Sequence, residues 1–205
     1  MQCFRVAIAA VNFDLITTLV IRDIASGFDQ RMPPLPRISL PNLRTLVLGE
    51  SSALQLLDKR TAELYPRLRT LTVTGEVYLD SPSPRTNWLG LRSAAEWPMP
   101  SVEELLVQLP LYGSDEDHMP ADNLRRSLEA LDCTTLDAII HAYRRRTVRL
   151  EIRVLWTRLP LSAAVRLVED VVRDRLSETA STCMSAGECS RDCMQHIWYL
   201  TRPWT

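Results

Sequence analysis

The chain has 205 residues, of which 46% are hydrophobic and 24% are charged, and its formal net charge at pH 7 is -1. A chain of this length and apolar content can bury one hydrophobic core. The near-balance of charge excludes an overall electrostatic attraction to nucleic acid or to an anionic membrane. The longest apolar run near the N-terminus, residues 6–11, is shorter than a signal-peptide core or a membrane span. We therefore expect an intracellular protein without a membrane segment.

A single phrase with the pattern L-x-x-L-x-L recurs along the first half of the chain. Its copies begin at residues 16, 43, 68 and 102, in steps of 27, 25 and 34 residues, and a proline opens the last three (Pro41, Pro66 and Pro100). Two of the steps lie within the roughly 20–29 residues of a leucine-rich repeat, and the third is lengthened by an insertion. In each copy we expect the first apolar residue in a turn and the last two in a strand.

The segments between the copies predict helices or irregular structure. Residues 51–64 begin with the capping residue Ser51 and place Leu54, Leu57, Thr61 and Leu64 on one face, which predicts a helix. Residues 88–97 predict a short helical or irregular packing segment. After the fourth copy, Pro110 should end the element, and residues 113–120 form an acidic loop.

The second half predicts helices over 123–131 and 136–144, the latter capped by Thr134 or Thr135, then a strand over 147–155 and a helix over 160–176. The expected fold is therefore α/β. It is an irregular leucine-rich-repeat solenoid over residues 1–176, with a parallel sheet on the concave face and helices or loops on the convex face. Residues 177–205 are expected to be a loosely ordered tail.

Alternation within the strands identifies the residues that face a partner. Side chains between the interior leucines should point out of the concave side of the sheet. These candidate partner-binding residues are Thr18, Val20, Thr45, Val47, Thr70, Thr72, Glu104, Leu106, Arg149 and Glu151. Because Val20, Val47 and Leu106 make the row more apolar than solvent exposure requires, it predicts a protein-binding surface. The alternative is that a loop, or a missing part of the protein, covers the row.

The phrase P-x-L-R-T-L-x-L, read at Pro41–Leu48 and Pro66–Val73, together with irregular repeat lengths and scattered tryptophans, resembles the leucine-rich-repeat region of fungal F-box proteins. The resemblance covers roughly residues 16–155. It implies a module that holds the substrate of a ubiquitin ligase. No F-box-like segment precedes Ile16, so the resemblance implies adaptor binding only if a missing F-box is supplied. Where many leucine-rich repeats place an asparagine, this chain has Ser51, Glu76 and Pro110.

Two other groups of residues offer alternative functions. Six arginines between Arg144 and Arg158 form a basic stripe (Arg144, Arg145, Arg146, Arg149, Arg153 and Arg158). The stripe suits phosphates or an acidic protein, and we favour the acidic protein because few aromatic residues for base stacking are interleaved. Cys183, Cys189, Cys193 and His196 carry ligands that suit zinc, but the group lacks paired C-x2-C spacing. We favour free thiols in a mobile tail.

The sequence carries no recognisable catalytic motif. It has no glycine-rich phosphate loop, no G-x-S-x-G and no H-E-x-x-H. The adjacent carboxylates Glu103–Glu104 and Glu169–Asp170 point in different directions on a strand or helix, so neither makes a catalytic pair. We therefore expect a binding protein that uses no cofactor and has an unknown protein partner.

Overall fold

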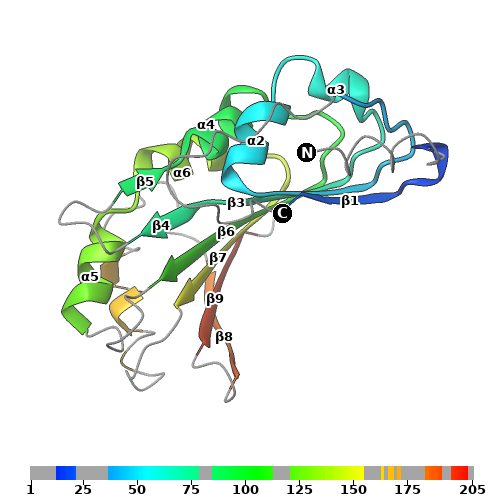
Figure 1. Ribbon diagram of the computed structural model, residues 1–205. Helices are drawn as coiled ribbons and strands as arrows, with labels where there is room; N and C mark the ends of the chain where they lie inside the picture. The colour runs from blue at the N-terminus through cyan, green and yellow to red at the C-terminus, as the bar shows by residue number, and fades with distance from the viewer. Residues whose placement is uncertain are drawn as a thin grey trace, which may run out of the picture.

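A parallel sheet lies at the centre of the molecule. The computed structural model describes residues 13–21, 37–78, 85–112, 121–154, 163, 166–168, 170–171, 183–190 and 195–202. Its five parallel strands follow one another in chain order: β1 (Thr18–Ile21), β2 (Thr45–Leu48), β3 (Thr70–Thr74), β6 (Glu104–Tyr112) and β7 (Thr147–Val154) (Figure 1). The predicted strands in the four copies of the phrase, and the strand predicted over 147–155, are confirmed.

The copies of the phrase are in register with one another. Equivalent positions across the sheet are occupied by Leu19, Leu46, Leu71, Leu105 and Val148. The same turn precedes each of the first four parallel strands, β1, β2, β3 and β6. In that turn the first apolar residue of the phrase donates its backbone N–H to the carbonyl three residues earlier, from Ile16 to Phe13, Leu43 to Leu40, Leu68 to Tyr65 and Val102 to Met99. Leu43, Leu68 and Val102 are fully buried, so the predicted turn position of this residue is confirmed.

Four helices lie on one side of the sheet. They are α2 (Glu50–Leu56), α3 (Thr61–Leu64), α4 (Leu89–Glu96) and α6 (Cys133–Ala142), and Figure 1 shows them above the strands. A fifth helix, α5 (Ala121–Glu129), precedes α6, and a short 3-10 helix, η2 (Phe13–Leu15), precedes β1. The face of the parallel strands opposite α2, α3, α4 and α6 is called the helix-free face below.

The hydrophobic core fills the space between the strands and these helices. Alternate strand residues point into it, and Leu46, Leu48, Leu71, Leu105 and Leu109 have no exposed area. The helices contribute apolar side chains from their sheet-facing sides, among them Ala53, Leu91 and Ile139. This packing explains why the strand leucines recur every second residue.

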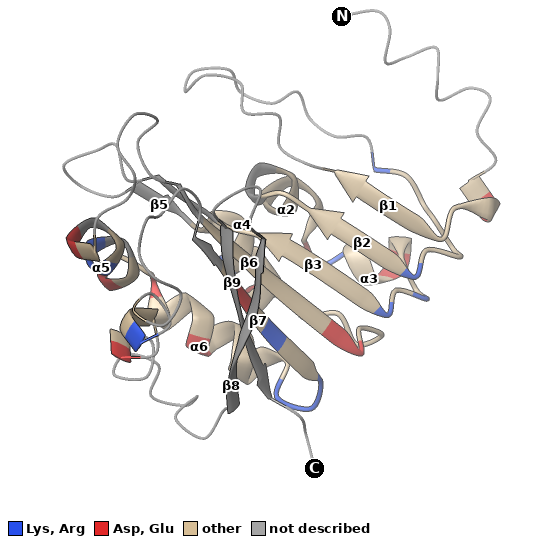
Figure 2. Ribbon diagram, turned by 90° about the horizontal axis from the view of Figure 1, so that it is seen from below, with Lys and Arg blue, Asp and Glu red and all other residues tan. Residues whose placement is uncertain are grey.

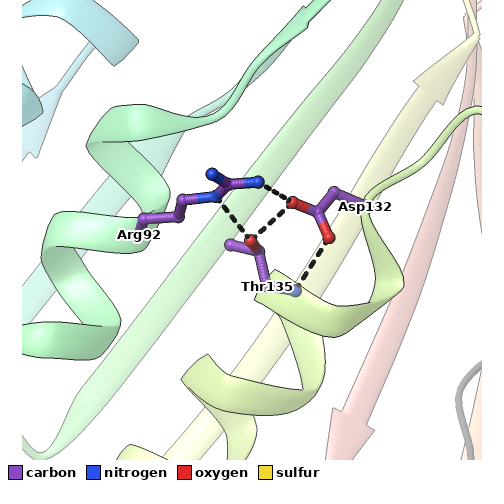
Figure 3. A network of polar contacts seen from close by, with 3 residues as sticks. All are labelled: Arg92, Asp132 and Thr135. Atoms are coloured by element: carbon purple, nitrogen blue, oxygen red, sulfur yellow. Dashed lines mark hydrogen bonds and ion pairs between the residues drawn. The ribbon is translucent and has the colours of Figure 1, made fainter.

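A polar network joins α4 to α6 on the helix side (Figure 3). Asp132 caps the N-terminus of α6 by accepting a hydrogen bond from the backbone N–H of Thr135 at 3.1 Å. Its other carboxylate oxygen accepts from the Thr135 hydroxyl at 2.7 Å and from the guanidinium of Arg92 on α4 at 2.8 Å. Partial burial raises the pKa of Asp132, but the hydrogen bonds from Arg92 and Thr135 together outweigh burial and bring the pKa below its ordinary value. Both carboxylate oxygens are thus engaged in holding two helices together.

Two strands extend the sheet beyond β7. β9 (Gln195–Arg202) pairs with β7 and β8 (Cys183–Ser190) pairs with β9, both antiparallel. The loosely ordered tail expected over 177–205 therefore contributes two strands. The apolar run Ile197–Leu200 is the local signal for β9, and the surrounding Ser, Thr and Cys residues obscured it.

The single helix predicted over 51–64 is wrong in detail, because the chain forms α2 and α3 with a break between them. At the break the Thr61 hydroxyl donates to the Leu56 carbonyl at 2.6 Å and accepts from the Asp58 backbone N–H at 2.8 Å. The Asp58 carboxylate accepts from the Arg60 backbone N–H at 2.8 Å. These side chains replace helical hydrogen bonds with local ones. Leu54, which the predicted helix placed on the inner face, lies within α2 and is 46% exposed.

The prediction that Pro110 ends its element is also wrong, because β6 continues to Tyr112. β6 pairs with β3 as far as Gln108 and then, from Leu111, with β4 (Glu76–Tyr78), which also pairs with β5 (Arg85–Asn87). Pro110 lies in the gap between these two pairings. A proline there removes no ladder hydrogen bond on that side, so the strand passes through it.

The remaining helix predictions fall on partly described segments. α5 and α6 correspond to the helices predicted over 123–131 and 136–144, although Asp132, not a threonine, caps the second. In the predicted helix over 160–176, residues 163, 166–168 and 170–171 are helical, and Val168 and Val171 are buried as expected. The acidic loop over 113–120 lies outside the described residues.

Together these elements establish an α/β protein with a five-stranded parallel sheet and helices. The described residues do not show the curl of a solenoid. The sequence pattern predicted the strands and their order, which depend on local alternation and repeat length. Curvature depends instead on how neighbouring units pack, which the pattern does not contain.

Candidate functional site

The predicted partner-binding residues lie in rows across the helix-free face. The first row contains Thr18, Thr45, Thr70 and Glu104, and the second contains Val20, Val47, Thr72, Leu106 and Arg149. Glu151 belongs to a third row, two residues further along the strands. The structure therefore brings together nine of the ten predicted residues as two adjacent rows, with the tenth beside them.

Exposure divides the second row into two parts. Val20 is 48% exposed and Val47 is half-buried, whereas Thr72 is only 6% exposed. Leu106 is half-buried and Arg149 is exposed. The buried Thr72 on β3 thus separates Val20 and Val47 on one side from Leu106 and Arg149 on the other. The expectation of a continuous accessible row is wrong at Thr72, and also at Glu151, which is 3% exposed.

The third row is a polar ladder that the sequence prediction missed. Gln108 on β6 donates from its Nε2 to Oε2 of Glu151 on β7 at 2.9 Å, and Thr74 on β3 donates from its hydroxyl to Oε1 of Gln108 at 3.4 Å. A buried carboxylate is stabilised by such hydrogen bonds. Extending the alternation by two residues beyond each L-x-L would have found Thr74 and Gln108 from the sequence.

Charged residues in or just before the first two rows pair across strands near the points where the strands begin. Nε of Arg149 lies 3.1 Å from Oε1 of Glu104, and Nε of Arg69 lies 3.8 Å from Oε1 of Glu103. All four side chains are between 36% and 65% exposed, so each pair contributes at most about 1 kcal/mol. These pairs restrict side-chain geometry at the edge of the helix-free face without adding much stability.

The residues after the repeat prolines form a second cross-strand chain at the same edge. The Asn42 side chain donates to the backbone carbonyl of Asp14 at 2.8 Å, and Arg67 donates to Oδ1 of Asn42 at 2.7 Å. The backbone at Arg44, Arg69 and Glu103 is also linked strand to strand. Figure 2 shows basic residues at the starts of β2 and β3 and acidic residues at the start of β6. We call this edge the strand-start edge, formed by residues 41–44, 66–69, 100–104 and 144–147.

The first half of the predicted arginine stripe lies on the strand-start edge. Arg144 and Arg145 are exposed, and Arg146 is half-buried. Together with residues 98–100 they line a cavity of about 380 Å³. Arg149 lies on the helix-free face, Arg153 is opposite Ile197 of β9, and Arg158 lies outside the described residues. The six arginines therefore do not form a single stripe in the part of the chain that the structure describes.

The cysteine and histidine residues of the C-terminal segment are separated by the strand register. Cys189 and His196 are cross-strand partners in β8 and β9, while Cys183 is opposite Thr201. Cys183 and Cys189 are six residues apart along one strand, which is about 20 Å. Cys193 lies outside the described residues. A four-ligand zinc site that includes both Cys183 and Cys189 does not fit this register.

None of the helices in the described part of the chain is long and apolar enough to cross a membrane. Comparisons of the chain with protein-family models, curated proteins and solved structures gave no match. No family is therefore identified, and the resemblance to the repeats of fungal F-box proteins depends on the sequence phrase alone. Any function must be argued from the geometry of the helix-free face and the strand-start edge.

Proposed function

We propose that this chain is a protein-interaction module, not an enzyme, built from leucine-rich-repeat-like units, and that a protein partner binds its helix-free face. The repeated unit consists of a proline-led turn, a strand and a return segment that carries helix. Support for it comes from the identical entry turns and the uninterrupted register from Leu19 to Leu105. The proposal includes curvature of the array into an irregular solenoid, with the helix-free face on its concave side.

The observation that carries the proposal is the exposure of Val20 beside Val47 and three threonines. Val20 is 48% exposed although it lies in a strand, and the neighbouring row consists of Thr18 on the same strand, Thr45 on β2 and Thr70 on β3. β1, β2 and β3 contain no charged residue, and Figure 2 shows charge only at the points where these strands begin. An uncharged surface of mixed valine and threonine suits a protein partner better than a polyanion.

The size of the surface sets a requirement on the partner. From β1 to β7 there are four inter-strand gaps, which is about 19 Å, and two rows of side chains add about 7 Å along the strands. This area is well below the roughly 800 Å² that each partner buries in a standard interface. A stable partner must therefore also contact the strand-start edge, whereas a partner confined to the rows would bind transiently.

The more specific form of the proposal is substrate recognition for a ubiquitin ligase. It follows from the resemblance of Pro41–Leu48 and Pro66–Val73 to the repeats of F-box proteins. In that form the module acts inside the cell and the helix-free face holds the protein to be modified. Contact with the ligase adaptor would require an F-box in addition to the repeat units.

The proposal can be tested by affinity capture from a fungal cell extract with matched surface variants. Val20→Asp places a charge on the helix-free face, and Leu89→Asp does the same at a residue of α4 that is 47% exposed, against 48% for Val20. A partner of the helix-free face should be recovered with the wild type and with Leu89→Asp but lost with Val20→Asp. Ligase subunits among the partners would support the specific form. Equal recovery by both variants would contradict the proposal.

A further inference from the structure

We propose that the cavity between the chain segments leading into β6 and β7 binds a short acidic segment, a run of Asp and Glu residues, of a partner protein. The cavity has a volume of about 380 Å³ and is lined by residues 98–100 and 142–146. This volume is at the lower end of the roughly 300–1,000 Å³ of ligand sites in proteins. The site does not depend on the helix-free face, so either proposal can fail alone.

Two hydrogen bonds hold the walls of the cavity at a fixed separation. The backbone N–H of Met99 donates to the hydroxyl of Tyr143 at 3.3 Å, and Tyr143 is only 2% exposed. Nη2 of Arg146 donates to the carbonyl of Pro100 at 2.8 Å. Each bond joins one wall to the other across more than 40 residues of sequence, so the cavity is formed before a ligand arrives, which reduces the entropy lost on binding.

The charge on one wall of the cavity favours an anion. Arg144, Arg145 and Arg146 are consecutive, and like charges at this spacing repel one another. Neither Arg144 nor Arg145 forms an ion pair with any residue in the described ranges, and both are exposed. A ligand carboxylate would relieve this repulsion, and the planar guanidinium group accepts a carboxylate through two parallel hydrogen bonds.

The surroundings favour an acidic peptide over a nucleic acid. Glu103 and Glu104 lie at the start of β6, between Arg69, which precedes β3, and the arginines that precede β7, and would repel a continuous phosphate backbone. The aromatic residue of the cavity, Tyr143, is buried, and its hydroxyl is engaged, so it offers no face for base stacking. A short run of carboxylates can occupy the arginine wall without passing the two glutamates.

The test measures binding of a fluorescent oligoglutamate peptide to the full chain by fluorescence anisotropy. The double variant Arg144→Gln/Arg145→Gln should weaken binding roughly tenfold or more. The control Arg125→Gln/Arg126→Gln removes the same charge from an adjacent, exposed arginine pair on α5 and should change the affinity by less than about twofold. Raising the salt from about 50 to about 300 mM should weaken wild-type binding, because these charges are exposed to solvent.

A second measurement needs no variant and so does not depend on the folding of one. Oligoglutamate should protect Arg144 and Arg145 of the wild-type chain from modification by phenylglyoxal, mapped by mass spectrometry, and should leave Arg125 and Arg126 reactive. Absence of peptide binding, equal loss of affinity in both double variants, or no protection of Arg144 and Arg145 would overturn the proposal. So would tighter binding of oligothymidylate with the same arginine dependence, which would assign the cavity to nucleic acid.

Discussion

Replacing Leu71 with alanine measures how strongly the stacked interior of the sheet holds the fold together. Leu71 has no exposed area and lies in register between Leu46 and Leu105, beneath α2 and α4. The substitution removes the equivalent of about three methylene groups, worth about 2.4 kcal/mol of transfer free energy at about 0.8 kcal/mol each. Because strands flank Leu71 on both sides, the space cannot collapse fully, and the cavity raises the expected loss in the free energy of unfolding to about 3–5 kcal/mol.

The matched control for this prediction is Thr70→Ala, one residue earlier in the same strand. Thr70 is half-buried on the helix-free face, so its truncation should change the free energy of unfolding by at most about 1 kcal/mol. Urea unfolding followed by far-UV circular dichroism gives both values. Leu19→Ala deletes the same atoms from β1, where the leucine is half-buried, and should give an intermediate loss. Equal losses for Leu71→Ala and Thr70→Ala would refute the assignment of faces in the sheet.

Two further predictions concern the helix side and its contact with the sheet. Asp132→Ala removes the cap of α6 and the partner of Arg92, and should reduce the free energy of unfolding by about 1–2 kcal/mol at pH 7 in thermal or urea unfolding. Because the pKa of Asp132 is lowered in the folded state, its contribution is present above its unfolded pKa of about 4 and disappears as the pH falls through the folded value. The difference between wild type and variant should therefore shrink below about pH 4, and a constant difference would contradict this account. Gly75→Ala would place a Cβ 2.7 Å from Cδ1 of the fully buried Leu91 and 3.1 Å from Cδ2 of Leu109, so it should destabilise the protein by about 1–3 kcal/mol in the same assay; an unchanged or increased stability would show that Leu91 can move.

The strands were predictable because the local spacing of apolar residues indicates each one. The spacing of Leu43, Leu46 and Leu48 fixes a turn residue followed by two inward residues, and the next copy repeats that spacing at Leu68, Leu71 and Val73. All six side chains are fully buried. Since side chains alternate strictly along a strand, the same spacing also identified the outward residues and their rows.

The features that could not be predicted from the sequence depend on contacts between distant residues. Thr72 and Val47 occupy equivalent positions in neighbouring strands, yet Thr72 is 6% exposed and Val47 is half-buried. A proline ends most strands, but Pro110 lies where β6 changes its partner from β3 to β4. Neither outcome follows from a local pattern, because the first depends on the surroundings of Thr72 in the folded chain and the second on which strand lies alongside β6.

The cavity was missed for the same reason. Arg144, Arg145 and Arg146 were recognised as a basic cluster, but the opposite wall comes from Pro98–Pro100, more than 40 residues earlier. Only the pairing of β6 with β7 brings the two entry segments together. The repeat itself provides a clue, since the carbonyl of Met99 accepts the hydrogen bond of the turn before β6, as the carbonyls of Leu40 and Tyr65 do in the turns before β2 and β3. Neighbouring entry turns of a parallel array must lie side by side.

The distribution of charge pairs separates the parts of this protein that stabilise it from the parts available to a partner. On the helix side, Arg92 with Asp132 and Arg37 with Asp58 form ion pairs at 2.8 and 2.7 Å, and Asp132 and Asp58 also accept backbone hydrogen bonds. Moving such a charged side chain to a ligand would cost free energy, because the ligand would have to replace several hydrogen bonds at once. On the strand-start edge the pairs are longer, at 3.1 and 3.8 Å, and involve more exposed side chains.

The arginines of the cavity rim extend this contrast. Arg144 and Arg145 have no ionic partner among the described residues, so a ligand carboxylate would compete only with water. Glu103 and Glu104, at the start of β6, already pair with Arg69 and Arg149. These pairs limit the attraction of the two glutamates for the arginines of the cavity. The strand-start edge and the adjoining uncharged rows of β1 and β2 are therefore where binding disturbs the fewest existing interactions. A partner that combined an acidic segment with an apolar one could contact both.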